Sequence, residues 1–398
     1  MSLENSLPKK GNGCTIKLNV FGYKKNHTTL NLTRGIKNLN QIAISQFLLI
    51  KNQILNLMFQ DNTLIGIDIG SNSIKIAESQ IIKGQKTITT YGVARHNIDL
   101  EGYWDSTKLR KLSKLINEII KTGEFVGIKA MIGASSRNVF VTSMDFEASW
   151  DKKMMQAEIE RQAIHFLPFP PDEMILSWDI INDDPRIKAY TGKQRVIINA
   201  LPDFVLENNR NLLEHINLDG VGLENQSISQ IRSMLKNDVG NTIIVDIGAK
   251  HTTFSIVVDG TLRSSNHLLI GGDKITQDLQ RELGVNELVA ENFKKDISLV
   301  NLYILPKVIF NNLSIIKSEL DSFIDLNRKI AQTPNKIIFT GGSVHMAGFG
   351  EFFKNSLIPT FIADPTKNIN IDEGHKAYIQ PIMCQLSTAI GLAMRENK

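Results

Sequence analysis

Two segments of the chain place an acidic residue, a glycine and small polar residues at the same spacing, and they are LIGIDIGSNSIKIAES at 64–79 and TIIVDIGAKHTTFSIV at 242–257. The pattern in each predicts a strand, a tight turn and a returning strand. Gly70 and Gly248 would let backbone amides approach a ligand, and the polar residues after them can bind phosphate oxygens. Asp68 and Asp246, at the strand ends, can hold a hydrated Mg²⁺. Because each segment opens one half of the chain, we expect a phosphate clamp between two related domains.

These residues also have simpler interpretations, which the sequence leaves open. Asp68 and Asp246 could cap the amides of their turns, as Asx-turns do. Lys75 could reach a phosphate as a point charge, or it could be a solvated lysine of the outgoing strand.

Length and composition indicate a globular protein of more than one domain. At 398 residues, two to three domains of ~150 residues are expected. Hydrophobic residues make up 42% and charged residues 22%, which is ordinary for a soluble protein. The two cysteines, Cys14 and Cys384, are far apart and have no metal-ligand spacing, so a reducing cytosol is the expected compartment.

The net charge of +4 comes from one end of the chain. Residues 1–62 hold eight lysine or arginine residues and two acidic residues, so the rest is slightly acidic. Without a basic face interleaved with aromatic residues, nucleic acid is not an expected partner.

The sequence of the N-terminal region does not predict a part of the folded body. Residues 1–39 lack a sustained period, and residues 41–59 are apolar but interrupted by polar side chains. Two interpretations remain: residues 1–57 are a non-native leader from a misplaced start, or 41–59 form an amphipathic helix that touches a membrane.

The body, from Thr63, shows a strand-rich plan that occurs twice. In the first half, strands are expected at 64–69, 73–79, 86–94, 127–133, 137–144, 174–182 and 194–201, with 127–133 and 137–144 as a pair. Helices are expected there at 106–122, 151–166, 202–216 and 225–237. In the second half, strands are expected at 242–247, 252–259 and 262–269 and a long helix at 302–326. The predicted architecture is α/β, with duplicated lobes and one insertion.

Five segments resemble the actin/Hsp70/sugar-kinase ATPase superfamily in the expected order: 68–75, GVGLENQS, 246–253, FTGGSV and AIGLAM. A narrower resemblance is to the type IV pilus assembly protein PilM family, relatives of the division protein FtsA. It rests on AEIERQAIHFLPFPPDEMILSWDII (157–181), IGGDKIT and FTGGSVHMAGFGEFF. The resemblance covers about 63–396.

The resemblance implies an actin-like fold that holds ATP and Mg²⁺ between two lobes. Its implied ligand residues form loops on both sides of the phosphates and glycine pairs beside ribose and adenine: Asp68, Gly70, Ser71, Asn72, Ser73, Lys75, Asp246, Gly248, Ala249, Thr252, Gly271, Gly272, Gly341, Gly342 and Ser343. Asp68 and Asp246 would orient waters on Mg²⁺.

Other implied roles are more open. Glu224 is the candidate that positions water for hydrolysis, or alternatively an acid stabilised at a helix N-terminus. Lys317 is the one plausible remnant of a ribose-binding pattern. Lys250 and His251 depart from the small residues expected in the second loop, which leaves ATP turnover open.

The resemblance also implies the domain boundaries. They are an N-terminal extension at 1–62, a first lobe at 63–96 and 183–240, an inserted interaction domain at 97–182 and a second lobe at 241–398. The inserted domain would receive the N-terminal peptide of PilN, an inner-membrane protein, through Met155, Ile159 and Phe166. These side chains could equally be the insertion's own core.

The implied function is a cytoplasmic scaffold of type IV pilus assembly, held at the inner membrane through partners and meeting the pilus motor ATPases. One alternative is an FtsA-like division filament, although the basic membrane helix that ends FtsA is not expected after MRENK. Another is a small-molecule kinase, which would need an Asp base in a deep pocket.

Overall fold

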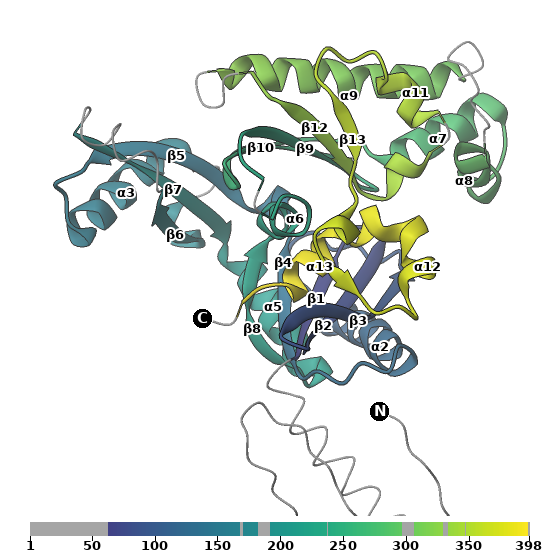
Figure 1. Ribbon diagram of the computed structural model, residues 1–398, viewed down its shortest axis with the longest axis horizontal. Coiled ribbons are helices and arrows are strands. Elements are labelled where there is room, and N and C mark those ends of the chain that lie inside the picture. The colour runs from purple at the N-terminus through teal and green to yellow at the C-terminus, as the bar shows by residue number, and fades with distance from the viewer. Residues whose placement is uncertain are drawn as a thin grey trace, which may run out of the picture. The chain divides into compact units, whose positions relative to one another are not determined.

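The computed structural model describes residues 63–167, 170–181, 192–236, 238–296, 306–328, 333–346 and 348–396 (Figure 1). All of them belong to one compact unit, Phe59–Lys398. The predictions for residues 1–62 lie outside the described residues. Within the described ranges, no helix is both long and apolar enough to cross a membrane.

The first sheet has six strands in the order β14-β3-β2-β1-β4-β8. Their bounds are β1 (Thr63–Ile69), β2 (Ser73–Ile82), β3 (Gln85–Arg95), β4 (Lys129–Ala134), β8 (Asp219–Asn225) and β14 (Asn370–Ile371). All seven residues of β1 are buried, because helices cover both faces of the sheet. One face packs on α2 (Ser106–Thr122) and α5 (Asp203–Ile216), and the other on α13 (Ser387–Ala393).

The second sheet has five strands in the order β11-β10-β9-β12-β13. They are β9 (Asn241–Ile247), β10 (Thr252–Val258), β11 (Thr261–Leu268), β12 (Lys336–Thr340) and β13 (Thr360–Ile362). The order β11-β10-β9-β12 repeats β3-β2-β1-β4, with two antiparallel pairs and one parallel pair in each. The predicted duplication is therefore present in the strand order.

Helices cover the second sheet and join it to the first. They are α7 (Gly272–Leu283), α8 (Glu287–Asp296), α9 (Lys307–Leu326) and α11 (Phe349–Phe353) on the second half, and α6 (Gln226–Met234) and α12 (Lys376–Ile379) elsewhere. The described residues also include short 3₁₀ turns: η1 (Ser136–Asn138), η2 (Pro171–Glu173), η4 (Gly342–His345), η5 (Pro365–Lys367) and η6 (Gln380–Leu386). Helix α6 packs on α13 and also contacts β4, β8 and β11, so it lies between the two sheets.

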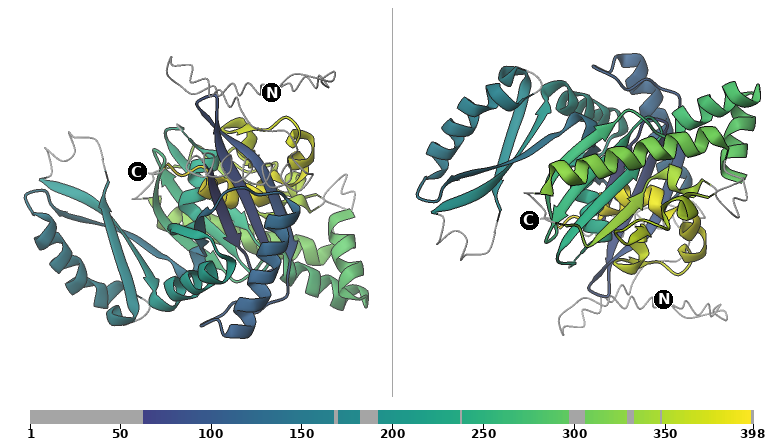
Figure 2. Two further views of the ribbon diagram at one scale, coloured as in Figure 1. Left: turned by 90° about the horizontal axis from the view of Figure 1, so that it is seen from below. Right: turned by 90° about the horizontal axis from the view of Figure 1, so that it is seen from above.

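A third, smaller sheet has the order β5-β7-β6, with β5 (Phe140–Glu147), β6 (Met174–Ile180) and β7 (Lys193–Pro202). Helix α3 (Lys152–Phe166) covers one face, and Asp151 caps it by accepting from the backbone N–H of Met154 at 2.8 Å. Figure 2 shows this sheet and α3 to one side of the two larger sheets. We call β5, β6, β7 and α3 the inserted unit.

The strand pairing differs from the expected division of the first half. The segments 127–133 and 137–144 do not pair with each other, because β4 pairs in parallel with β1 while β5 pairs with β7. A parallel pair needs a crossover, and α2 supplies it, so α2 and β4 belong with the first sheet rather than with an insertion at 97–182. The third sheet instead runs from β5 to β7, beyond residue 182. At the other end, β14 and α13 pack with the first sheet although they follow residue 241.

Candidate functional site

A cavity of about 1110 Å³ lies where the two halves meet, and both Asp-Ile-Gly loops line it. Most of the residues expected from the sequence are in its wall: Asp68, Gly70, Ser71, Asn72, Ser73, Lys75, Asp246, Gly248, Ala249, Gly272, Gly341, Gly342 and Ser343. The fold thus brings together residues more than 250 positions apart. Their roles toward a ligand remain predictions.

The two loops have the same backbone geometry. In the first, the Gly70 amide donates to the Ser73 carbonyl at 3.0 Å, and in the second Gly248 donates to His251 at 3.0 Å. Each bond closes the turn between an incoming and a returning strand. Lys75 lies opposite Asp68 on the neighbouring strand, and its Nζ is 3.1 Å from Asp68 Oδ2. Its charge therefore neutralises this carboxylate and would also be available to a bound phosphate.

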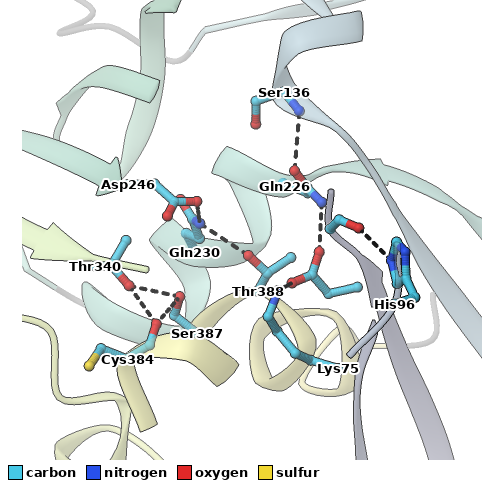
Figure 3. A network of polar contacts seen from close by, with 12 residues as sticks. Lys75, His96, Ser136, Gln226, Gln230, Asp246, Thr340, Cys384, Ser387 and Thr388 are labelled. Atoms are coloured by element: carbon cyan, nitrogen blue, oxygen red, sulfur yellow. Dashed lines mark hydrogen bonds and ion pairs between the residues drawn. The ribbon is translucent and has the colours of Figure 1, made fainter. Parts of the chain in front are cut away.

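Two glutamines of α6 hold the two carboxylates (Figure 3). Gln226 Nε2 donates to Asp68 Oδ1 at 2.7 Å, and Gln230 Nε2 donates to Asp246 Oδ2 at 2.7 Å. The glutamines are four residues apart and therefore share a helix face. The sequence motifs did not single out these glutamines, although two amide side chains one helical turn apart were an available signal.

The electrostatics of the carboxylates suit a cation. Burial raises the pKa of Asp246, the nearby Asp68 raises it further, and the hydrogen bond from Gln230 opposes the rise. Across the described residues, no three histidine, cysteine or acidic side chains converge as a metal cage. Mg²⁺ suits such a place, because it is usually bound by one or two carboxylates together with phosphates and water.

Glycines are required where the loops approach each other. Gly341 has φ +92°, and a Cβ there would lie 2.4 Å from Asp246 Oδ1. A Cβ at Gly271 would lie 2.4 Å from the Ala249 carbonyl oxygen, so Gly271 supports the second loop from outside the cavity wall. Thr252 is also outside the wall, and its Oγ1 donates to the Ile270 carbonyl at 2.7 Å.

Lys317 is not at the cavity. It lies on α9 and pairs with Asp321 one helical turn away, at 2.6 Å. A lysine–glutamate pair of α8 lines the cavity instead: Lys294 Nζ is 2.6 Å from Glu291 Oε2 and donates to the Gly272 carbonyl at 3.1 Å. Burial lowers the pKa of Lys294. Burial acts against the charge of Glu291. The hydrogen bond and charge of Lys294, together with hydrogen bonds from Thr276 and Lys295, outweigh burial and lower the pKa of Glu291 to about 2.

Glu224 does not line the cavity either. Its carboxylate is bound by Arg232, at 2.7 and 2.8 Å, and by Arg395 at 3.0 Å. A carboxylate with two guanidinium partners is a structural group rather than a base for water. The polar side chain that this segment presents to the cavity is Gln226.

One hydrogen-bonded pair crosses the cavity between the halves. Asn72 Nδ2, in the first loop, lies 2.8 Å from both carboxylate oxygens of Asp273, at the start of α7. Burial raises the pKa of Asp273, while the hydrogen bond from Asn72 lowers it. Asn72 is thus engaged by the opposite half.

Met155 and Ile159, expected to contact a partner peptide, are core residues. They are 1% and 0% exposed and pack with Phe146, Val196 and Ile198. The apolar residues on this face of α3 are therefore explained by the packing of the helix on its own sheet. The side chain of Phe166 lies outside the described residues.

His251 and His267 form a half-buried pair next to the second loop, with ring centroids 6.4 Å apart. Burial, then His267, Arg137 and Lys250, lower the pKa of His251 to about 4. Burial and Arg137 lower the pKa of His267 to about 4, against a hydrogen bond to the backbone of Ser136. Both rings are therefore neutral at pH 7.

This pair predicts a loss of stability in mild acid. Because an unfolded histidine has a pKa of about 6.5, the unfolded chain binds more protons between about pH 4 and 6.5, and the free energy of unfolding falls as the pH drops through that range. At pH 5 each histidine should lower the free energy of unfolding by up to about 2 kcal/mol. Denaturant unfolding at pH 7 and pH 5 should show a smaller loss in the His251→Gln/His267→Gln variant. The exposed His165→Gln is the control, and an undiminished loss in the double variant would contradict the prediction.

Comparisons with known proteins agree with this architecture. The model of the family described as type IV pilus assembly protein PilM matches residues 66–397. The cell division protein FtsA of Streptococcus pneumoniae is 22% identical over 347 residues, 74% of this chain and 73% of that protein. FtsA of Enterococcus faecalis is 24% identical over 260 residues, 60% of this chain and 58% of that protein.

Two solved structures are similar in fold. A PilM–PilN type IV pilus biogenesis complex contains a chain with a TM-score of 0.72 and 17% identity, covering 83% of this chain and 98% of that one. The ethanolamine utilization protein EutJ from Carboxydothermus hydrogenoformans has a TM-score of 0.51 and 14% identity, covering 83% of this chain and 89% of EutJ. The predicted actin-like α/β fold is confirmed. With a family model matched over nearly all of the body, the chain belongs to the type IV pilus assembly protein PilM family.

Proposed function

We propose that this protein is a nucleotide-binding scaffold of type IV pilus assembly, with Mg–ATP as its ligand in the cavity between the halves. The observation that carries the proposal is the pair of matching loops, each with a buried carboxylate held by a glutamine of α6. The Gly70 and Gly248 turns would face the phosphates, and Lys294 with Glu291 would lie toward the sugar. Bound Mg²⁺ would neutralise phosphate charge, while Asp68 and Asp246 would orient its waters.

We further propose that the partner is the N-terminal peptide of a PilN-like inner-membrane protein, a role supported by the name of the similar complex. Through it the protein would sit at the cytoplasmic face of the inner membrane and meet the pilus motor ATPases. Met155 and Ile159 are buried in the core of the inserted unit, so these two side chains do not supply a receiving surface. A different surface is therefore needed.

We propose that an apolar part of the cavity wall provides that surface. It is lined by half-buried or buried side chains of the loop after β3 and the start of α5: Ile98, Leu100, Trp104, Phe204 and Val205. Asn208 holds this loop in place, because its Oδ1 accepts from the Trp104 amide and its Nδ2 donates to the Gly102 carbonyl, both at 2.9 Å. A fixed apolar wall with backbone groups nearby can anchor a short extended peptide.

The test is a titration of the full chain with a synthetic peptide from the N-terminus of the PilN-like protein of the same organism. Trp104→Ala and Phe204→Ala should each weaken binding at least about tenfold, as buried aromatic anchors do. Ile164→Ser, on the exposed face of α3, is the control and should bind like the wild type. Thermal unfolding of each variant checks that it is folded.

Other outcomes would redirect the proposal. Loss of binding in Ile164→Ser alone would move the peptide to α3. If no peptide bound but Mg–ATP caused the protein to sediment as filaments, the FtsA-like alternative would be favoured, in keeping with its 22% identity to FtsA.

A further inference from the structure

The inserted unit is connected to one half of the molecule and packed against the other. The chain enters it from β4 through η1 and leaves it from β7 directly into α5, both in the first half. Its strand β5, however, contacts β11, the edge strand of the second sheet. Val141 and Ile197 of the inserted unit share a core with residues of the second half. Any movement of one half relative to the other must therefore change the contacts at this junction.

At the base of the inserted unit, η1 is fastened to the start of α6. Ser136 is 3% exposed, and its Oγ lies 3.0 Å from both Asn225 Oδ1 and Ser227 Oγ. Ser255 Oγ of β10 donates in turn to Ser227 Oγ at 3.0 Å. A buried chain of three hydroxyls thus joins η1, α6 and the second sheet. Buried polar chains of this kind fix the relative position of the elements they join.

The same junction is tied to the cavity by one side chain. The Gln226 amide donates through Nε2 to Asp68 Oδ1 at 2.7 Å and accepts through Oε1 from the Ser136 N–H at 3.3 Å (Figure 3). Because both ends of one rigid amide are engaged, a change at Asp68 moves the group that holds η1. From the second half, His267 of β11 bonds to the backbone of Ser136 and lies 3.2 Å from Thr253 Oγ1, in the strand that leaves the second loop.

We propose that Gln226 is a positioning residue that transmits occupancy of the cavity to the inserted unit through Ser136. When Mg–ATP binds next to Asp68, the Gln226 amide moves, and the hydrogen bond that it accepts from the Ser136 N–H changes. The turn η1 then moves, and β5 shifts relative to β11. The inference rests on the proposed nucleotide binding and adds a route by which that binding changes the inserted unit, whose strand β7 leads directly into α5, the helix that carries Phe204 and Val205. Coupling of this kind is reciprocal, so a bound partner would change nucleotide affinity by the same factor.

Hydrogen exchange of the full chain, with and without saturating Mg–ATP, tests the route without any partner. In the wild type, amides of β5 and β7 should change their exchange rates by at least about fivefold, within the usual range of coupling between sites. Gln226→Met should reduce the change to less than about twofold at its own saturating nucleotide concentration.

Two further variants separate transmission from binding. Gln230→Met is the matched control. Gln230 lies on the same helix face and holds the other carboxylate, while its hydrogen-bond partners, Asp246 and Thr388, lie outside η1. Gln230→Met should weaken nucleotide binding but keep the exchange response at saturation. Ser136 lies outside the cavity wall, so Ser136→Ala should bind Mg–ATP like the wild type. The variant keeps the backbone N–H that Gln226 accepts from, but it removes the Oγ contacts with Asn225 and Ser227 that fasten η1 to the start of α6. With η1 no longer fastened there, most of the response in β5 and β7 should be lost.

Several results would overturn the inference. A wild type that binds Mg–ATP without any change in β5 or β7 would exclude the coupling, and a full response in both Gln226→Met and Ser136→Ala would exclude this route. Failure of the wild type to bind Mg–ATP in a direct titration would instead remove the proposed function, and the inference with it.

Discussion

Asp246→Asn is expected to weaken Mg–ATP binding by about tenfold to a hundredfold, the usual cost of removing a group that orients a metal's ligands. The substitution keeps the size of the side chain and an acceptor for Gln230. It removes a negative charge from a buried position next to Asp68, where a cation would relieve the repulsion. The loss should therefore appear in the presence of Mg²⁺ and be small in its absence.

Titration of a fluorescent ATP analogue, with Mg²⁺ and with EDTA, measures this effect. Asp172→Asn, at an exposed acid of η2, is the control for a change of charge alone. If Asp246→Asn bound the magnesium complex as tightly as the wild type, the second loop would not be the cation side of the site.

Gly391→Ala is expected to destabilise the protein by about 3 kcal/mol, at the upper end of what overpacking costs. Helices α6 and α13 cross closely at this glycine, and a Cβ there would lie 1.8 Å from the Ser229 carbonyl oxygen. The obstacle is backbone in the helix that carries Gln226 and Gln230, so it cannot rotate away. The helices would have to separate, and the site would be disturbed with them.

Denaturant unfolding of the two proteins gives the difference in free energy. Gly350→Ala in α11 is the matched control, because a Cβ at that position meets nothing within 4 Å. It should be neutral or stabilising by up to about 1 kcal/mol. Equal unfolding midpoints for Gly391→Ala and the wild type would show that α6 and α13 do not pack as described.

Local sequence patterns predicted the two loops well, for a physical reason. In a strand–turn–strand segment the residues that approach a ligand are adjacent in sequence, so Asp68 and Gly70 could be placed without knowing the rest of the fold. The repeated order of strands followed from the repeat of these segments. The glycines at 271 and 341 were recognisable for the same reason, because close approach forbids a side chain there.

The predictions that were wrong depended on which way a side chain faces after folding. Glu224 and Gln226 are two residues apart. Only the packing of α6 on β8 and α13 determines that the arginines bind Glu224 while Gln226 reaches Asp68. Lys317 and Lys294 are both helical lysines, and the contact of α8 with α7 brings Lys294 to the cavity. Met155 and Ile159 showed an apolar helix face, which cannot reveal whether the covering surface is a partner or the protein's own sheet.

The most direct test of the proposed nucleotide site is a crystal structure of the full chain grown with Mg²⁺ and a non-hydrolysable ATP analogue. We expect phosphates between the Gly70 and Gly248 turns, Mg²⁺ with its waters facing Asp68 and Asp246, and the ribose next to Lys294 and Glu291. A nucleotide bound elsewhere, or a cavity still without nucleotide at saturating concentration, would contradict this proposal.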